Sequence, residues 1–178
     1  MAQKQIVGYH GTTKNHAEAI LRCGRFYDST KDNEWLGHGV YFFEHKGYAI
    51  EWTKQDRFKY EIGHVLAADL IFDEIQLLDL DDPYDYAILE DVINKLLERY
   101  NNEGKSIVIK EKGLAEKSKQ WCFACNAIRK LQPNIGIIIY TFQMYRPTDY
   151  ARGFFQKNQR QICVSDHRII HNIRTEVC

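Results

Sequence analysis

The sequence predicts a single α+β domain, in which strands near both ends of the chain alternate with short helices. Its 178 residues fit one domain, and its content of hydrophobic (44%) and charged (27%) residues is that of a chain with an ordinary buried core. Apolar residues recur with the two-residue period of strands in some segments and with the helical period in others. We therefore expect residues 1–178 to fold as one unit with several strands and helices.

The first half of the chain is predicted to contain two strands and two helices. Thr13 is a good helix N-cap and Gly24 a typical helix stop, which predicts a helix over 14–23. Residues 25–37 are polar and irregular. The other expected elements are a strand over 4–9, a short apolar strand over 39–43, and a helix over 45–58 with Tyr48, Ala49 and Trp52 on its inner face.

The second half is predicted to hold two longer helices and the remaining strands. Residues 62–71 and 75–80 alternate loosely and are expected to pair with each other. A helix over 84–100 has an apolar stripe of Ile88, Val92, Ile93, Leu96 and Leu97. The elements expected after it are a helix over 116–131, a buried strand over 135–143, a polar, basic loop over 146–160, and a closing hairpin of 161–165 and 168–177.

Several classes of protein are excluded by what the sequence lacks. No window holds the roughly 18 consecutive apolar residues of a membrane span, and the first residues lack a charged region followed by an apolar run. We therefore expect a cytoplasmic protein without membrane contact, whose five cysteines are reduced thiols. Cys122 and Cys125 lie in a helical stripe without two further ligands at metal-site spacing, so no metal is expected.

Charge is unevenly distributed along the chain although the net charge is zero. Residues 1–100 hold 11 basic and 18 acidic side chains, and residues 101–178 hold 13 basic and 6 acidic ones. Between Lys59 and Lys95 every charged residue is acidic. Such a run is typical of a solvated face, and it also suits a surface for a basic partner. The basic second half favours attraction of nucleic acid.

Three short motifs stand out as candidates for a functional site. They are Tyr9-His10-Gly11-Thr12 at a strand end, Gly37-His38-Gly39-Val40-Tyr41-Phe42 about thirty residues later, and Arg160-Gln161-Ile162-Cys163-Val164 on a late strand. Each motif alone is typical of a turn or a core strand. Their occurrence together, in this order and with this strand–helix context, indicates a ligand site.

This combination resembles the diphtheria-toxin-like and poly(ADP-ribose)-polymerase-like clade of ADP-ribosyltransferases. Members carry His-Gly-Ser/Thr on the first strand, Gly-x-Gly-Ile/Val-Tyr-Phe on the second, and usually Glu on a late strand. The resemblance covers residues 6–52 well and 160–175 weakly, and it does not extend to 60–145. It implies the split-sheet fold of that family, in which two small antiparallel sheets flank an NAD cleft and helices lie at the periphery.

The resemblance also implies roles for individual residues, with NAD as substrate. His10, Tyr41 and Gln161 would be the catalytic set: His10 would orient ribose hydroxyls, Tyr41 would stack on the nicotinamide, and Gln161 would accept from a ribose hydroxyl. The remaining NAD-binding residues would be Gly11, whose backbone approaches the carboxamide, Tyr48 as a second aromatic wall, Thr12, Gly39 and Arg25.

Gln161 stands where polymerases of the family have Glu. An amide carbonyl orients a hydroxyl but does not take its proton, which favours transfer of a single ADP-ribose over chain elongation. A separate general base is then needed, and the sequence leaves three candidates open: Asp149, Asp166 and Glu176.

The acceptor is expected to be a macromolecule. Basic and aromatic residues are interleaved before Gln161, and this pattern suits phosphates and stacked bases. RNA or DNA is therefore slightly favoured over protein. The expected acceptor contacts are Gln159, Arg152, Phe154 and Arg160.

The resemblance therefore implies an NAD-dependent mono-ADP-ribosyltransferase that releases nicotinamide. Family habit suggests a toxin of a toxin–antitoxin or phage-defence system, with an antitoxin protein as partner. Two alternatives stay open: an enzyme similar to RNA 2′-phosphotransferase, and a catalytically inactive NAD-binding module.

Overall fold

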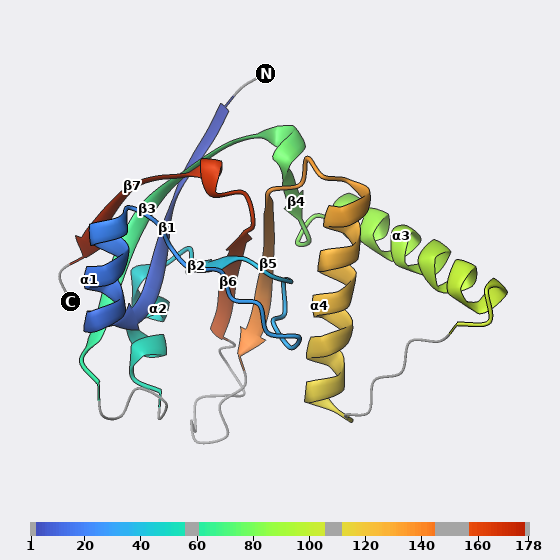
Figure 1. The fold of residues 1–178 in the computed structure, drawn as a ribbon, viewed down its shortest axis with the longest axis horizontal. Helices are drawn as coiled ribbons and strands as arrows, with labels where there is room; N and C mark the ends of the chain where they lie inside the picture. The colour runs from blue at the N-terminus through green and yellow to red at the C-terminus, as the bar shows by residue number, and fades with distance from the viewer. Residues whose placement is uncertain (1–2, 56–60, 106–111, 145–156, 177–178) are drawn as a thin grey trace.

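The structure of the protein is a computed structural model. It contains one strongly twisted sheet with helices on both faces (Figure 1). The structure describes residues 3–55, 61–105, 112–144 and 157–176. The strands are β1 (Gln3–Thr13), β2 (Val40–Phe43), β3 (Gly63–Asp73), β4 (Leu77–Asp79), β5 (Ile137–Met144), β6 (Lys157–Val164) and β7 (Ile170–Glu176). The helices are α1 (Lys14–Cys23), α2 (Lys46–Thr53), α3 (Pro83–Asn102) and α4 (Leu114–Leu131), with short 3-10 turns η2 (Glu74–Gln76) and η4 (His167–Ile169). The predicted α+β class is confirmed.

The order of strands in the sheet is β4-β5-β6-β2-β1-β3-β7. Neighbours run antiparallel, except for the parallel pair β4–β5. β1 pairs with β3 from Gln3 to Thr13, whereas β1 meets β2 at the single residue pair Tyr9–Phe43. The seven strands thus form one mixed sheet, where two antiparallel sheets were predicted, and its two halves are joined at one point.

Two predicted strand pairings are wrong. β3 does not pair with β4; it lies between β1 and β7, and its run of buried residues from Val65 to Ala68 is that of an inner strand covered on both faces. β6 and β7 do not form a hairpin, because the chain leaves β6, turns through η4 with Ile169 buried, and pairs β7 with β3 at the opposite edge.

Local end signals account for the first and third helices. The Thr13 hydroxyl accepts from the backbone N–H of His16, and Gly24 adopts the left-handed conformation at φ 65°, so the predicted helix 14–23 is confirmed. The N-cap of α3 is Asp82, with Pro83 at the first helical position. α2 ends at Thr53, before the predicted limit of 58, and residues 56–60 lie outside the described ranges.

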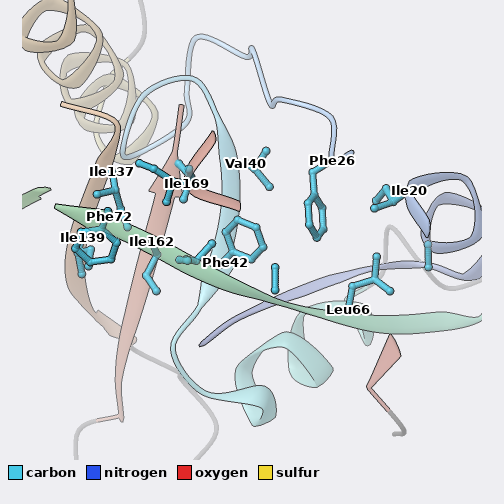
Figure 2. Packing of buried hydrophobic residues seen from close by; sticks show 14 residues of the cluster. Ile20, Phe26, Val40, Phe42, Leu66, Phe72, Ile137, Ile139, Ile162 and Ile169 are labelled. Carbon is cyan, nitrogen blue, oxygen red and sulfur yellow. The ribbon is translucent and has the colours of Figure 1, made fainter. Parts of the chain in front are cut away.

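The sheet has an α1 face and an α2/α4 face, each with its own core. On the α1 face, Phe26 and Phe42 contact each other edge to face beside Ile20 of α1 (Figure 2). The α2/α4 face holds two clusters, one around Leu36, Ile138 and Cys163 under α4, and one around Phe43 and Ala49 under α2. Adjacent residues of β2 therefore lie on opposite faces, with Val40 and Phe42 on one and Tyr41 and Phe43 on the other.

The four cysteines that the structure describes are free thiols, as predicted, and Cys122, Cys125 and Cys163 are buried. Within the described ranges, no helix has both the length and the apolar character needed to cross a bilayer. The predicted stripe of α3 is only partly covered: Leu97 is 38% exposed, and the buried residue of the helix, Leu89, lies outside that stripe.

Phe42→Ala is expected to lower the free energy of unfolding by about 3–5 kcal/mol, because this fully buried ring holds the α1 face together. Urea unfolding followed by circular dichroism measures the change. The matched control is Tyr27→Ala, at a ring that is 61% exposed, which should cost less than about 1 kcal/mol. Equal losses in the two variants would contradict this core.

Candidate functional site

A row of four side chains crosses the α2/α4 face at the middle of the sheet. Tyr9 pairs with Phe43, Phe43 with Gln161, and Gln161 with Tyr140. Residues that pair directly across strands point to the same side, so one amide stands in line with three aromatic rings. The row lies where β1 and β2 have their single contact, and it places Gln161 between the regions covered by α2 and α4.

Tyr41 lies on the same face as Gln161. Its strand partner is Cys163, which makes Gln161 its diagonal neighbour at a separation of about 7–8 Å. The phenol oxygen accepts from the backbone N–H of Leu36 at 2.9 Å and donates to the carbonyl of Gly37 at 2.7 Å. Burial raises the pKa of Tyr41, so the group stays a neutral donor. Two hydrogen bonds at the hydroxyl therefore hold the half-buried ring in place.

The Gly37–Gly39 turn is held by α4. Arg129 donates to the carbonyls of Leu36, His38 and Cys163, and the Asn126 side chain accepts from the backbone N–H of His38 at 2.9 Å. A Cβ at Gly37, whose φ is 80°, would lie 2.7 Å from Asn126 Oδ1. Neither α4 residue was predicted for the site. In the sequence, Arg129 has only the pattern of a basic residue near a helix C-terminus.

Gln159 and Gln161 form an amide pair on the α2/α4 face. The Gln161 Nε2 donates to the Gln159 Oε1 at 3.2 Å. Gln159 is only 6% exposed, whereas Gln161 is half-buried. The bond engages the amide nitrogen of Gln161 and not its carbonyl oxygen. The burial of Gln159 leaves it little surface for the contact with a macromolecule that was predicted for it.

Tyr48 bridges α2 and β6. Its hydroxyl donates to the carbonyl of Asn158 at 2.7 Å, and its ring packs with Phe43 and Ala49. The structure thus places Tyr41, Tyr48 and Gln161 on one face of the sheet.

His10 lies on the other face. Its ring packs edge-on against Phe26 at 5.1 Å and Phe42 at 6.0 Å between centroids, within the α1-face core. The imidazole does not share the face of Tyr41 and Gln161, in contrast to the predicted convergence of the three groups. It is linked to that face through one bond, from Nδ1 to the backbone carbonyl of Tyr41 at 2.8 Å.

That bond fixes the tautomer of His10. A carbonyl only accepts, so Nδ1 carries the proton and the neutral ring presents Nε2 as an acceptor. Burial lowers the pKa of His10, which also favours the neutral ring. The His10 side chain donates a hydrogen bond to the Tyr41 carbonyl just beyond the Tyr9–Phe43 pair, where β1 and β2 separate.

The remaining predicted NAD contacts have structural roles or are exposed. A Cβ at Gly11 would lie 2.4 Å from the carbonyl oxygen of Ala49, and one at Gly39, whose φ is 150°, would lie 2.5 Å from that of Val164. Both glycines thus allow close packing of backbones. Thr12 is buried, and Arg25 is exposed after the end of α1.

Arg160 is occupied by carboxylates. Its guanidinium lies 2.6 Å from Asp79, 3.3 Å from Asp81 and 3.5 Å from Glu44. These contacts neutralise its charge and attach β6 to the chain around β4, so the guanidinium is not free to hold an acceptor phosphate as had been predicted. The other two predicted acceptor contacts, Arg152 and Phe154, lie outside the described residues.

The described candidates for a general base are paired with basic residues. Asp166 accepts from the backbone and guanidinium of Arg168, which hold its pKa below the usual value. Glu176 lies 3.4 Å from Lys46. The third candidate, Asp149, lies outside the described residues.

An aromatic cluster that the sequence interpretation missed flanks Gln161. Trp121 of α4 lies 4.9 Å from Tyr140 between ring centroids, and Trp35 lies 5.6 Å from Phe142. Tyr140 and Phe142 are the strand partners of Gln161 and Gln159. The glutamine pair therefore has aromatic rings on both sides, with Phe43 and Tyr48 toward α2 and this cluster toward α4.

Comparison with known proteins leaves the family undefined. No protein-family profile and no solved structure matches the chain. An uncharacterized protein of Methanocaldococcus jannaschii is 29% identical over 102 residues, covering 54% of this chain and 47% of the relative. The chain thus spans about half the length of the curated relative that it matches.

The pH dependence of stability is expected to reveal the buried, neutral His10. Because its pKa in the folded protein is lowered, the unfolded chain binds the proton more readily, and stability falls as pH decreases below about 6.5. His10→Asn keeps a donor for the Tyr41 carbonyl but does not titrate. Urea unfolding at pH 7.5 and 5.5 should show a shallower decline for His10→Asn than for the wild type.

His171→Asn, at an exposed histidine, is the matched control and should decline like the wild type. An unchanged slope in His10→Asn would show that His10 is not the titrating group.

Proposed function

We propose that this protein is an NAD-dependent mono-ADP-ribosyltransferase with a split-sheet fold. The observation that carries the proposal is the placement of Tyr41, Tyr48 and Gln161 on one face of the sheet, along β6 and its neighbours. Two of the three motifs that resemble the transferase family contribute to this face, with Tyr41 from the second and Gln161 from the third, whereas His10 of the first lies on the other face. The single Tyr9–Phe43 pair supports a sheet that is split in the family's manner.

The side chains on this face suit a flat ring attached to a sugar. The pinned ring of Tyr41 and the ring of Tyr48 offer stacking surfaces, which contribute roughly 0.5–1.5 kcal/mol per pair beyond burial. The Gln161 carbonyl, oriented by Gln159, offers an acceptor for a ribose hydroxyl. His10 fits less well, because it reaches this face only through the Tyr41 backbone. Its role in the proposal is to position Tyr41.

The proposed reaction breaks the bond between nicotinamide and ribose and forms one between the ribose and an acceptor. Nicotinamide leaves as a neutral molecule, and the acceptor gives up a proton. A carbonyl dipole directed at the sugar stabilises the positive charge that develops there, less strongly than a carboxylate would. The proposed acceptor is a macromolecule, RNA or DNA before protein, and an antitoxin protein is a proposed partner.

A second candidate function is an NAD-binding module without catalysis. It is favoured by the placement of His10 on the α1 face and by the pairing of Asp166 and Glu176 with basic residues. The two candidates share the ligand and differ in turnover, so one assay separates them.

Nicotinamide release from NAD is expected for the wild type, with a rate that rises in the presence of RNA, DNA or protein. Gln161→Leu should lower that rate about 100-fold or more, because it removes the acceptor directed at the sugar. The control is Gln143→Leu, at an exposed glutamine on the neighbouring strand β5. Chromatographic quantification of nicotinamide, with calorimetry of NAD binding, provides the measurement.

Binding without release in every mixture would favour the module. Neither binding nor release by the folded wild type would eliminate both candidates.

Gln161→Glu is expected to raise the rate of nicotinamide release about tenfold or more. A carboxylate stabilises developing positive charge better than an amide, and Gln159 can turn its own amide to donate to the new carboxylate. Steady-state kinetics of the variant and the wild type at equal NAD concentration measure the effect. A rate equal to that of Gln161→Leu would argue against a sugar-facing carbonyl.

A further inference from the structure

A groove of about 640 Å³ runs between α3 and α4, and it shares Trp121 with the aromatic cluster beside Gln161. Helix α3 reaches outward from the body of the molecule and meets it mainly through α4 (Figure 1). The α3 side of the groove consists of Tyr86, Leu89, Glu90, Ile93, Asn94 and Leu97. These residues recur at the spacing of one helix face and extend over about 16 Å, or three turns.

The groove is lined by apolar side chains together with four polar ones. On the α4 side it is lined by Glu116, Gln120, Trp121, Phe123 and Ala124. Of the side chains on α3, only Leu89 is buried, although the helix carries an apolar stripe. A 20-residue amphipathic helix gains most of its stability from covering its apolar face, and α4 covers only part of this one.

The charge of the groove indicates which kind of partner covers the rest of the apolar face of α3. The charged residues that line the groove are Glu90 and Glu116, both acidic. Glu90 belongs to the stretch between Lys59 and Lys95 in which every charged side chain is acidic, and Glu116 adds a second carboxylate from α4. An acidic, apolar groove attracts a basic, apolar partner and repels nucleic acid.

A second copy of this chain fits less well. Two-fold pairing through the groove would place Glu90 and Glu116 of one protomer opposite the same residues of the other. Like charges at a dry interface oppose association. A partner that brings its own lysines or arginines avoids this repulsion.

We propose that the α3–α4 groove binds an amphipathic helix of a partner protein, with its apolar stripe on Ile93, Leu97 and Phe123 and with basic residues beside Glu90 and Glu116. The three-turn length of the groove matches the spacing of apolar anchors in helices that bind in grooves. The proposal does not depend on NAD binding.

The test uses a fluorescein-labelled 15-residue synthetic helix with leucines along one face and lysines beside them. A second peptide has glutamates in place of the lysines. Fluorescence anisotropy with the full chain should show that the lysine peptide binds at least tenfold more tightly, with an affinity that falls as salt rises. Equal binding of the two peptides, or no binding of either, would overturn the proposal.

Two matched pairs of variants locate the binding. Glu90→Lys should weaken binding of the lysine peptide about tenfold, whereas Glu98→Lys, on the same helix but outside the groove, should change it less than about twofold. Leu97→Glu should abolish binding, and Leu131→Glu, at the exposed end of α4, should not. Leu97 is partly exposed already, and thermal unfolding of each variant shows that the fold is kept.

Equal effects within either pair would show that the peptide binds elsewhere. Light scattering of the chain without peptide tests whether a second copy of the chain occupies the groove. A dimer that Leu97→Glu dissociates would assign the groove to a second copy and overturn the proposal.

Discussion

The architecture depends on a narrow junction in the middle of the sheet. β1 and β2 meet at one residue pair, Tyr9–Phe43, and the two halves of the sheet separate beyond it. The His10 imidazole bonds to the Tyr41 carbonyl where the strands part, and the edge-to-face rings of Phe26 and Phe42 pack beneath it. The neutral, desolvated imidazole thus adds a hydrogen bond between β1 and β2 beyond their single backbone pair.

The residues that hold the candidate site in place lie outside its three motifs. Arg129 ties the Gly37–Gly39 turn to β6 through three carbonyls, and the turn in turn fixes the Tyr41 hydroxyl. Gln159 fixes the amide of Gln161 in the same way. The exposed surfaces of Tyr41 and Gln161 are therefore held by groups that point away from any ligand, and this rigidity is what a site for a flat, planar molecule requires.

Much of the local structure could be predicted from the sequence, because caps and periodicity act over a few residues. Thr13 and Gly24 set the ends of α1 for this reason. Strand partners could not be predicted in this way: β4 and β7 join opposite edges of the sheet, a choice made by the packing of the whole chain. The alternation of side chains between the two faces of a strand explains why the predicted position of His10 was wrong. It projects to the face opposite that of its neighbour Tyr9, and motif resemblance carries no information on that parity. Arg129 escaped notice because its partners, Leu36 and Cys163, are distant in sequence.

Helix α4 belongs to two neighbourhoods at once. Trp121 and Phe123 line the groove against α3, and Asn126 and Arg129, about one to two turns further along the same helix, bond to the Gly37–Gly39 turn beside Tyr41. A helix as short as α4 moves as a unit with little bending. A displacement of α4 would therefore move the wall of the groove and the Gly37–Gly39 turn together.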